Sequence, residues 1–196
     1  MKCLFRVLLC VATVAVSCPP AHAQTTTFEV RIANHAVGTI EAQRKVTGSA
    51  KSITIKTRIQ TLLAKVNSDI LNEYDNNVLT LARSTRVAGK KGEDKETTTR
   101  RNGNDYTVLL NGARSVIDNT EIAHCVADLY FSEPKQVSRI FSEALGKFLP
   151  LRALGSGQYE LGLPEGKKNI YKYTNGVLTE VEVNHTLGRA LFVKTI

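Results

Sequence analysis

The side chains with the clearest chemical potential after residue 23 are three histidines and one cysteine. His35, His124 and His185 lie far apart in the sequence, and the close spacing of a metal motif such as H-x-x-x-H does not occur. His124 is adjacent to Cys125, and neighbouring residues of a strand point to opposite faces, which argues against a nucleophile–base pair. We therefore expect no metal site and no cofactor, and we expect Cys125 to be buried as a small apolar residue.

Two acidic residues have the spacing to share one face of a strand. Glu180 and Glu182 resemble the paired carboxylates of glycosidases, but they alternate with Val181 and Val183, which indicates that the acids face solvent. A G-x-S-x-G nucleophile elbow, a phosphate-binding glycine loop and an H-E-x-x-H motif are all missing from the sequence. We identify no catalytic residue and expect no enzyme, with an unrecognised hydrolase as the residual alternative.

A group of aromatic residues follows Cys125 in the sequence. Packed together they would fill a core, which is the usual role of buried aromatic rings. Around an open space they would instead line a pocket for a lipid-like or other apolar small molecule, because curved sheets and barrel mouths are common places for ligand cavities. The candidate ligand-lining residues are Tyr130, Phe131, Phe141, Phe148 and Tyr159.

The chain is basic, with a formal net charge of +8. Its basic residues alternate with acidic and polar ones along most of the chain, which does not favour nucleic acid as a partner. The densest group surrounds a glycine-rich turn at 89–94 and is typical of a solvated hairpin. The alternative is an anionic partner, such as a lipid headgroup or an acidic polysaccharide. The residues that would contact it are Lys90, Lys91, Arg100 and Arg101.

The elements that carry these residues are predicted to be strands. Apolar and polar residues alternate with a period of two over 28–32, 53–60, 105–110 and 177–183, and these segments are rich in Ile, Val, Thr and Tyr. Asn-Gly pairs at 102–103, 111–112 and 175–176 fit tight hairpin turns. We predict a meander of roughly ten antiparallel strands that curves strongly into an incomplete barrel, with a closed lipocalin-like barrel as the alternative.

One segment departs from the strand pattern. Between Ser132 and Gly146 the apolar residues recur with the spacing of one face of a helix. Ser132 fits an N-cap, Pro134 fits a first turn, and Gly146 fits a C-terminal stop. We predict one short helix near 132–145, lying against the concave face of the sheet.

The first 23 residues have the layout of a cleaved secretory signal. Basic residues precede an apolar run over 7–16, and the small-residue triplet Ala21-His22-Ala23 follows it. The run is shorter than the roughly 20 residues that span a bilayer. We expect a periplasmic or secreted protein in which 24–196 is one β-rich domain without a transmembrane span. Lipidation at Cys18 is the alternative.

Six short motifs are spread over most of 24–196, at 28–32, 37–40, 74–79, 129–134, 141–143 and 163–171. In these motifs the chain resembles a domain family of unknown function found in exported proteins of Gram-negative bacteria. The resemblance implies a strand order similar to the half-open barrels of the lipoprotein carrier (Lol) proteins, and it implies no catalytic residue. The lipid-binding cavity of the carriers extends to this chain only as an analogy of fold.

The sequence thus favours an exported envelope protein that binds an apolar or amphiphilic ligand between sheet and helix. The alternative is a protein–protein interaction module of the envelope that uses the basic hairpin or an edge of the sheet.

Overall fold

The computed structural model of this chain describes residues 21–62, 65–89, 94–185 and 188–195, and strands dominate them. These residues form fourteen strands and two short 3-10 helices, because the apolar side chains alternate with polar ones along most of the chain. The elements are β1 (His22–Ile32), β2 (His35–Thr47), β3 (Ala50–Gln60), β4 (Lys65–Asp75), β5 (Val78–Val87), β6 (Lys95–Asn102), β7 (Asp105–Leu110), β8 (Ala113–Ile117), η1 (Val126–Tyr130), β9 (Arg139–Ser142), β10 (Lys147–Gly155), β11 (Gln158–Gly162), η2 (Pro164–Gly166), β12 (Lys168–Thr174), β13 (Val177–His185) and β14 (Gly188–Lys194).

All of the strands belong to one antiparallel sheet, in the order β8-β7-β6-β5-β4-β3-β2-β1-β14-β13-β12-β11-β10-β9. The chain runs outward from β1 to the edge strand β8, passes to the opposite edge through 118–138, and returns from β9 to β14. At the centre of the sheet β1 pairs with β14, and this pairing places Val30 opposite Phe192. Apart from this pairing and the passage between the edges, each strand pairs with the next one, as a meander predicts. We call 118–138 the crossover.

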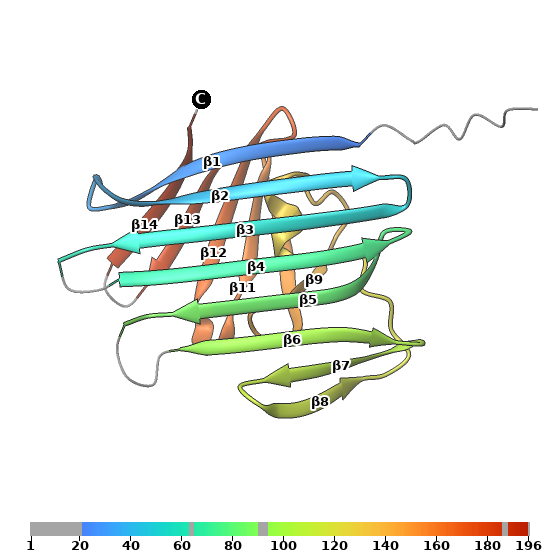
Figure 1. Cartoon of the computed structure of the whole chain (residues 1–196). Helices are drawn as coiled ribbons and strands as arrows, with labels where there is room; N and C mark the ends of the chain where they lie inside the picture. The colour runs from blue at the N-terminus through green and yellow to red at the C-terminus, as the bar shows by residue number, and fades with distance from the viewer. Residues whose placement is uncertain (1–20, 63–64, 90–93, 186–187, 196) are drawn as a thin grey trace, which may run out of the picture.

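The sheet curves until its two halves face each other, and it remains open (Figure 1). In Figure 1, β1 to β6 form a front layer, β11 to β14 cross behind it at a steep angle, and η1 lies between the two. The Thr97 hydroxyl of β6 donates a hydrogen bond of 3.0 Å to the Ala144 carbonyl, which ties the β9–β10 turn to the opposite half. The predicted incomplete barrel is therefore confirmed, with more strands than expected, and the closed alternative is wrong.

The predicted helix near 132–145 is wrong. The segment instead contains strand β9, in which Ile140 pairs with Leu149 of β10, and Gln136 has a positive φ of 62° that no α-helix accommodates. Ile140 and Phe141 are both buried although they are adjacent, because β9 has packed neighbours on both of its faces. Pairing with β10 outweighs the helical spacing of the apolar residues. The short helix on the concave face is η1, which the helix prediction missed.

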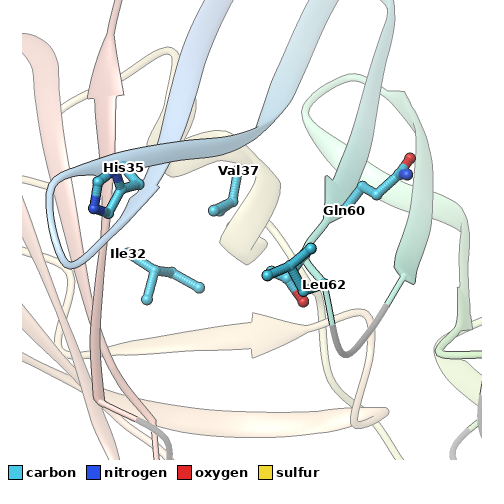
Figure 2. A pocket seen from close by; sticks show the side chains of 6 residues that line it. Ile32, His35, Val37, Gln60 and Leu62 are labelled. Atoms are coloured by element: carbon cyan, nitrogen blue, oxygen red, sulfur yellow. The ribbon is translucent and has the colours of Figure 1, made fainter.

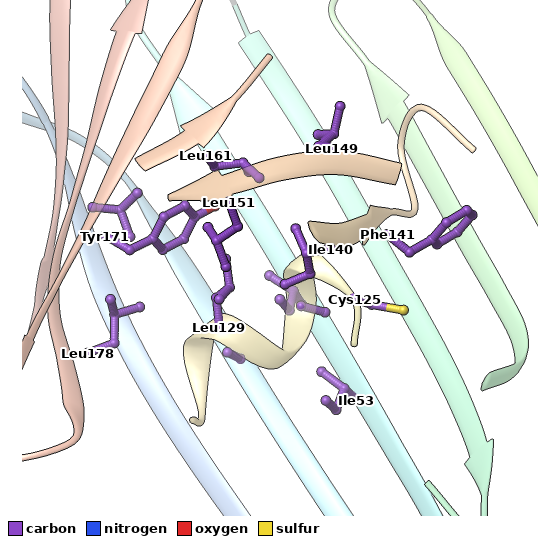
Figure 3. Packing of buried hydrophobic residues seen from close by; sticks show 14 of the residues in the cluster. Ile53, Cys125, Leu129, Ile140, Phe141, Leu149, Leu151, Leu161, Tyr171 and Leu178 are labelled. Atoms are coloured by element: carbon purple, nitrogen blue, oxygen red, sulfur yellow. The ribbon is translucent and has the colours of Figure 1, made fainter. Parts of the chain in front are cut away.

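The core occupies the space between the two halves of the sheet and under η1. Figure 3 shows Leu129 of η1 between Ile53 of β3 on one side and Leu151 of β10 on the other. All three side chains are buried, at 1%, 0% and 3% exposure. Because strands β3 and β10 lie far from each other in the sheet order, the crossover holds the two halves together.

The turns between neighbouring strands follow the predicted chemistry. Asn111-Gly112 and Asn175-Gly176 occupy the two central positions of the β7–β8 and β12–β13 turns, with φ values of 49° to 82°. The third predicted pair is shifted, since Asn102 is the last residue of β6 and pairs with Asp105. Asparagine and glycine tolerate positive φ, which explains their use in these turns.

The predicted signal sequence lies outside the described residues except for its last three. Strand β1 begins at His22, where His22 pairs with Val46 and Ala23 with Lys45. Cleavage after Ala23 would remove these two pairs and leave Gln24 opposite Arg44 as the first pair of the strand. None of the helical segments in the described part of the chain has the length and apolar character of a membrane span.

Candidate functional site

The five aromatic residues proposed to line a ligand pocket lie in three separate places. Phe141 is fully buried and meets Phe148 in an edge-to-face contact, with ring centroids 5.5 Å apart. The guanidinium of Arg139 lies over the Phe148 ring, 4.5 Å from its centroid. Side chains therefore fill the space beside Phe141, where a ligand would have to lie in the sequence-based hypothesis.

The other three aromatic residues pack against different strands. Tyr130 contacts Phe28 of β1 edge-to-face at 5.4 Å, and Phe131 lies beneath the guanidinium of Arg44 at 5.2 Å. Tyr159 contacts Tyr173 in the same edge-to-face geometry at 5.6 Å. Tyr159 also donates a hydrogen bond of 2.9 Å to Glu133 and lines an open hollow of about 510 Å³ beside 134–138. The structure does not bring the five residues together around one space.

A buried polar cluster joins the crossover to the front half of the sheet. Asp128 of η1 accepts hydrogen bonds from the Tyr74 hydroxyl at 2.6 Å and from the Cys125 backbone N–H at 2.9 Å. Its other carboxylate oxygen is 2.8 Å from the Lys51 ammonium, and this ion pair is largely buried, with exposures of 16% and 15%. Lys51 also lies over the Tyr74 ring, 3.8 Å from its centroid.

The second acid of this cluster, Glu143, is 1% exposed. One of its carboxylate oxygens accepts hydrogen bonds from the Asn72 side chain at 2.7 Å and from the Ala127 backbone N–H at 2.9 Å. Burial raises the pKa of Glu143 from its ordinary value of 4.5 to about 7, although these hydrogen bonds oppose the shift. Burial likewise raises the pKa of the Cys125 thiol, and it raises that of Tyr74. Cys125 is fully buried, as predicted from its apolar sequence neighbours.

We call Lys51, Asn72, Tyr74, Asp128 and Glu143 the crossover clamp. Sequence analysis missed it, because each member lies in a different segment and no motif links them. Two signals were present: Asp128 and Glu143 both stand among apolar neighbours, and Asn72 alternates in register with the buried Tyr74. Acids in such positions need buried partners, since an unpaired buried charge is costly.

An open apolar hollow lies at the end of the half-barrel, away from the clamp. It has a volume of about 730 Å³ and is bordered by the β1–β2 turn and the end of β3. Figure 2 shows Ile32, Val37 and Leu62 around the space between these elements. We call this space the mouth hollow. The residues that line it are Ile32, His35, Val37, Gln60, Thr61 and Leu62.

The mouth hollow lies beside a local irregularity between β1 and β2. The register shifts after Val30, so that Val30 pairs with Gly38 and Arg31 with Ala36, and Val37 is the extra residue of a bulge. Gly38 permits β2 and β3 to approach closely, since a Cβ on it would lie 2.2 Å from the Arg58 carbonyl oxygen. A second hollow of about 390 Å³ shares Val37 and Gln60 and is also lined by polar and basic residues, among them Arg58, Lys65 and Asn67.

Of the four basic residues proposed to contact an anionic partner, the structure describes Arg100 and Arg101. Lys90 and Lys91 lie outside the described residues. Arg101 donates a hydrogen bond to the Gly103 carbonyl at 2.9 Å and pairs with Glu121 at 3.3 Å. Arg100 is exposed on the opposite, outer face of β6. Both arginines border a hollow of about 270 Å³ on this hairpin, but of the two only Arg101 forms an ion pair among the described residues.

Of the three histidines proposed from the sequence, the structure describes the side chains of His35 and His124. His35 lines the mouth hollow, and His124 is exposed on the crossover. No group of three or more histidine, cysteine, aspartate or glutamate side chains within the described ranges has the arrangement of a metal site.

Comparison with known proteins identifies a family. Residues 28–195 match a family that is described as a domain of unknown function, DUF6134. No curated protein and no solved structure matches the chain.

Proposed function

The chain belongs to the DUF6134 family of domains of unknown function, and we propose that it binds an apolar or amphiphilic small molecule in the mouth hollow. The observation that carries this proposal is the exposure of Leu62, which is 104%, beside an open apolar hollow. Covering a leucine side chain is worth roughly 1.5–3 kcal/mol, so an apolar ligand would gain from lying there.

The dimensions of the mouth hollow support this role. Its volume of about 730 Å³ falls within the range of roughly 300–1,000 Å³ that is usual for ligand sites. Ile32, Val37 and Leu62 provide apolar walls, while His35 and Gln60 provide polar groups at the border. This combination of apolar walls and few polar groups is typical of a small-molecule site.

The adjoining hollow favours an amphiphile over a purely apolar molecule. Val37 and Gln60 line both hollows, so a ligand can place its apolar part in the mouth hollow and its polar head beside Arg58, Lys65 and Asn67. The proposed site differs from the sequence-based one, because the aromatic residues near Phe141 are packed against one another.

The proposed role is binding rather than catalysis. The acids and the lysine of the crossover clamp make hydrogen bonds and an ion pair with one another and with backbone groups, which is the pattern of a structural cluster. We further propose that the protein is exported, on the basis of the signal-like residues 1–23, and that it handles its ligand in the cell envelope as the half-open barrels of the Lol carriers do.

A fluorescent fatty-acid analogue, dansyl-undecanoic acid, tests the proposal by direct titration. We expect saturable binding that weakens at least tenfold in Val37→Asp and Leu62→Asp, because a carboxylate desolvated by the apolar part of the ligand is costly. The matched control is Val177→Asp, which makes the same change at an exposed valine beside the β12–β13 turn. Equal affinities in all three variants, or no saturable binding to the unmodified protein, would refute the proposal.

A further inference from the structure

The two edge strands of the sheet, β9 and β8, differ in whether another segment of the chain covers them. At β9 the crossover covers the edge: Phe141 forms a parallel bridge with Cys125, and its backbone N–H donates a hydrogen bond of 2.9 Å to the His124 carbonyl. At the other edge, β8 is the last strand, and no described residue pairs with its outer side. We propose that β8 binds an extended, acidic segment of a partner protein, which adds to the sheet as a further antiparallel or parallel strand.

The hairpin register shows which backbone groups of β8 are available. The β7–β8 turn has two central residues with positive φ, Asn111 at 49° and Gly112 at 82°, which is a type I′ turn closed by the pair Leu110–Ala113. Hydrogen-bonded and non-hydrogen-bonded pairs alternate along an antiparallel ladder from such a closing pair. The backbone N–H and C=O groups of Arg114 and Val116 therefore point away from β7, toward the free edge.

The side chains of the same two residues belong to an apolar and basic outer face. Arg114 pairs with Leu109, which pairs with Thr98, and Thr98 pairs with Arg83. Val116 pairs with Thr107, which pairs with Arg100. Leu109 and Val116 are exposed, at 41% and 49%. We call Arg83, Arg100, Leu109, Arg114 and Val116 the basic edge face.

The three arginines of the basic edge face lack acidic partners. Within the part of the chain that the structure describes, Arg83, Arg100 and Arg114 take part in none of the ion pairs. By contrast, the neighbouring Arg101 turns to the other face and pairs with Glu121. The charge of the basic edge face is thus left for a partner with the opposite sign.

The register specifies the chemistry of the partner strand. An acidic residue opposite Arg114 and an apolar residue two positions away, opposite Val116, would each meet a complementary side chain. A second copy of this chain fits less well, since edge-to-edge pairing of two β8 strands brings their arginines together. An anionic membrane surface would satisfy the arginines but would not provide a ladder for the free backbone groups.

Fluorescence anisotropy with a labelled synthetic peptide, Glu-Thr-Val-Thr-Glu-Thr-Val-Thr, tests this inference on the full mature chain. Its glutamates and valines share one face and can lie over Arg114 and Val116. We expect saturable binding that falls at least tenfold in Arg114→Glu and is lost in Val116→Pro, because proline removes the N–H that faces the free edge and leaves the β7 ladder intact. Lys56→Glu, the same charge reversal on the outer face of β3, is the matched control and should bind as the unmodified protein does.

Three results would overturn the inference. Equal binding of a peptide with lysine in place of glutamate would show that charge complementarity is not involved. A dimer in light scattering that Val116→Pro abolishes would identify a second copy as the occupant. Binding to vesicles of phosphatidylcholine and phosphatidylglycerol that is lost in Arg114→Glu but retained in Val116→Pro would identify an anionic lipid surface. Arg114→Glu leaves the backbone unchanged, so it decides the outcome even if Val116→Pro does not fold. Dansyl-undecanoic acid should bind equally to both variants, which separates this test from that of the mouth hollow.

Discussion

The region under the crossover and the mouth of the half-barrel are built from the same sheet but have opposite character. Under the crossover, apolar side chains interlock, and the carboxylates of Asp128 and Glu143 accept hydrogen bonds from buried side chains. At the mouth, Ile32 and Val37 border an open hollow, and Leu62 is fully exposed. The curved sheet thus has one closely packed region, under the crossover, and one open apolar region, at the mouth.

The largest expected effect on stability concerns the packed region under the crossover. We expect Phe141→Ala to lower the free energy of unfolding by about 3–5 kcal/mol, because it removes a fully buried ring and leaves a cavity. Phe131→Ala, at a half-buried ring, should cost less than half of that. Chemical denaturation of both variants measures the difference. If Phe141→Ala kept its stability and gained affinity for dansyl-undecanoic acid, the interior would be a ligand cavity after all.

The next largest effect concerns the contribution of the crossover clamp to the free energy of unfolding. Asp128→Ala removes the partner of Lys51 and Tyr74 in a largely buried place, and we expect it to cost about 3 kcal/mol of stability. The control is Asp69→Ala, which breaks the exposed ion pair with Arg58 and should cost less than about 1 kcal/mol. Similar losses in the two variants, measured by urea denaturation, would show that the clamp has no special role.

A smaller effect follows from the pKa of Glu143. Because burial raises this pKa to about 7, the folded protein binds a proton more tightly than the unfolded chain does. The stability that the protonated acid contributes is complete below about pH 4.5 and is lost as the pH rises through 7. We expect Glu143→Gln to become more stable than the unmodified protein by about 1–3 kcal/mol at pH 8 and to show no such gain at pH 4.5. Thermal melting at the two pH values measures this, and a gain that is the same at both would contradict it.

The smallest effect on stability is expected at the mouth. Leu62→Asp changes a fully exposed side chain, so its free energy of unfolding should stay within about 0.5 kcal/mol of the original value. The same variant should lose most of its affinity for the fatty-acid analogue. A large loss of stability would instead assign Leu62 to the folded core.

The sequence was sufficient for the parts of the fold that depend on local pattern. The alternation of apolar and polar residues predicts the strands, and the pairs Asn111-Gly112 and Asn175-Gly176 predict two of the turns. Both patterns are local, because side-chain direction and positive φ are properties of a few adjacent residues. The helix predicted near Ile140 is wrong, since a four-residue strand that is covered on both faces lacks alternation. Its pairing with Leu149 is a tertiary property that the local spacing does not reveal.

The candidate site was harder to predict for a related reason. The mouth hollow combines the bulge at Val37 with the end of β3, and only the register between strands brings Val37 and Leu62 together. Residue type alone does not distinguish a pocket from a core, and Phe141 and Phe148 pack against each other between β9 and β10. The clamp depends on Asn72 and Glu143, which are 71 residues apart.

Photo-crosslinking with a diazirine derivative of palmitic acid tests whether a ligand binds at the mouth, because it reports where an amphiphile lies on the folded protein. After irradiation and digestion, mass spectrometry locates the labelled residues. We predict labels in the peptides that contain Ile32, Val37 and Leu62, and we predict that Leu62→Asp reduces them. Labels concentrated instead on Phe141 and Phe148 would contradict the proposed site, since they would place the ligand under the crossover and not at the mouth.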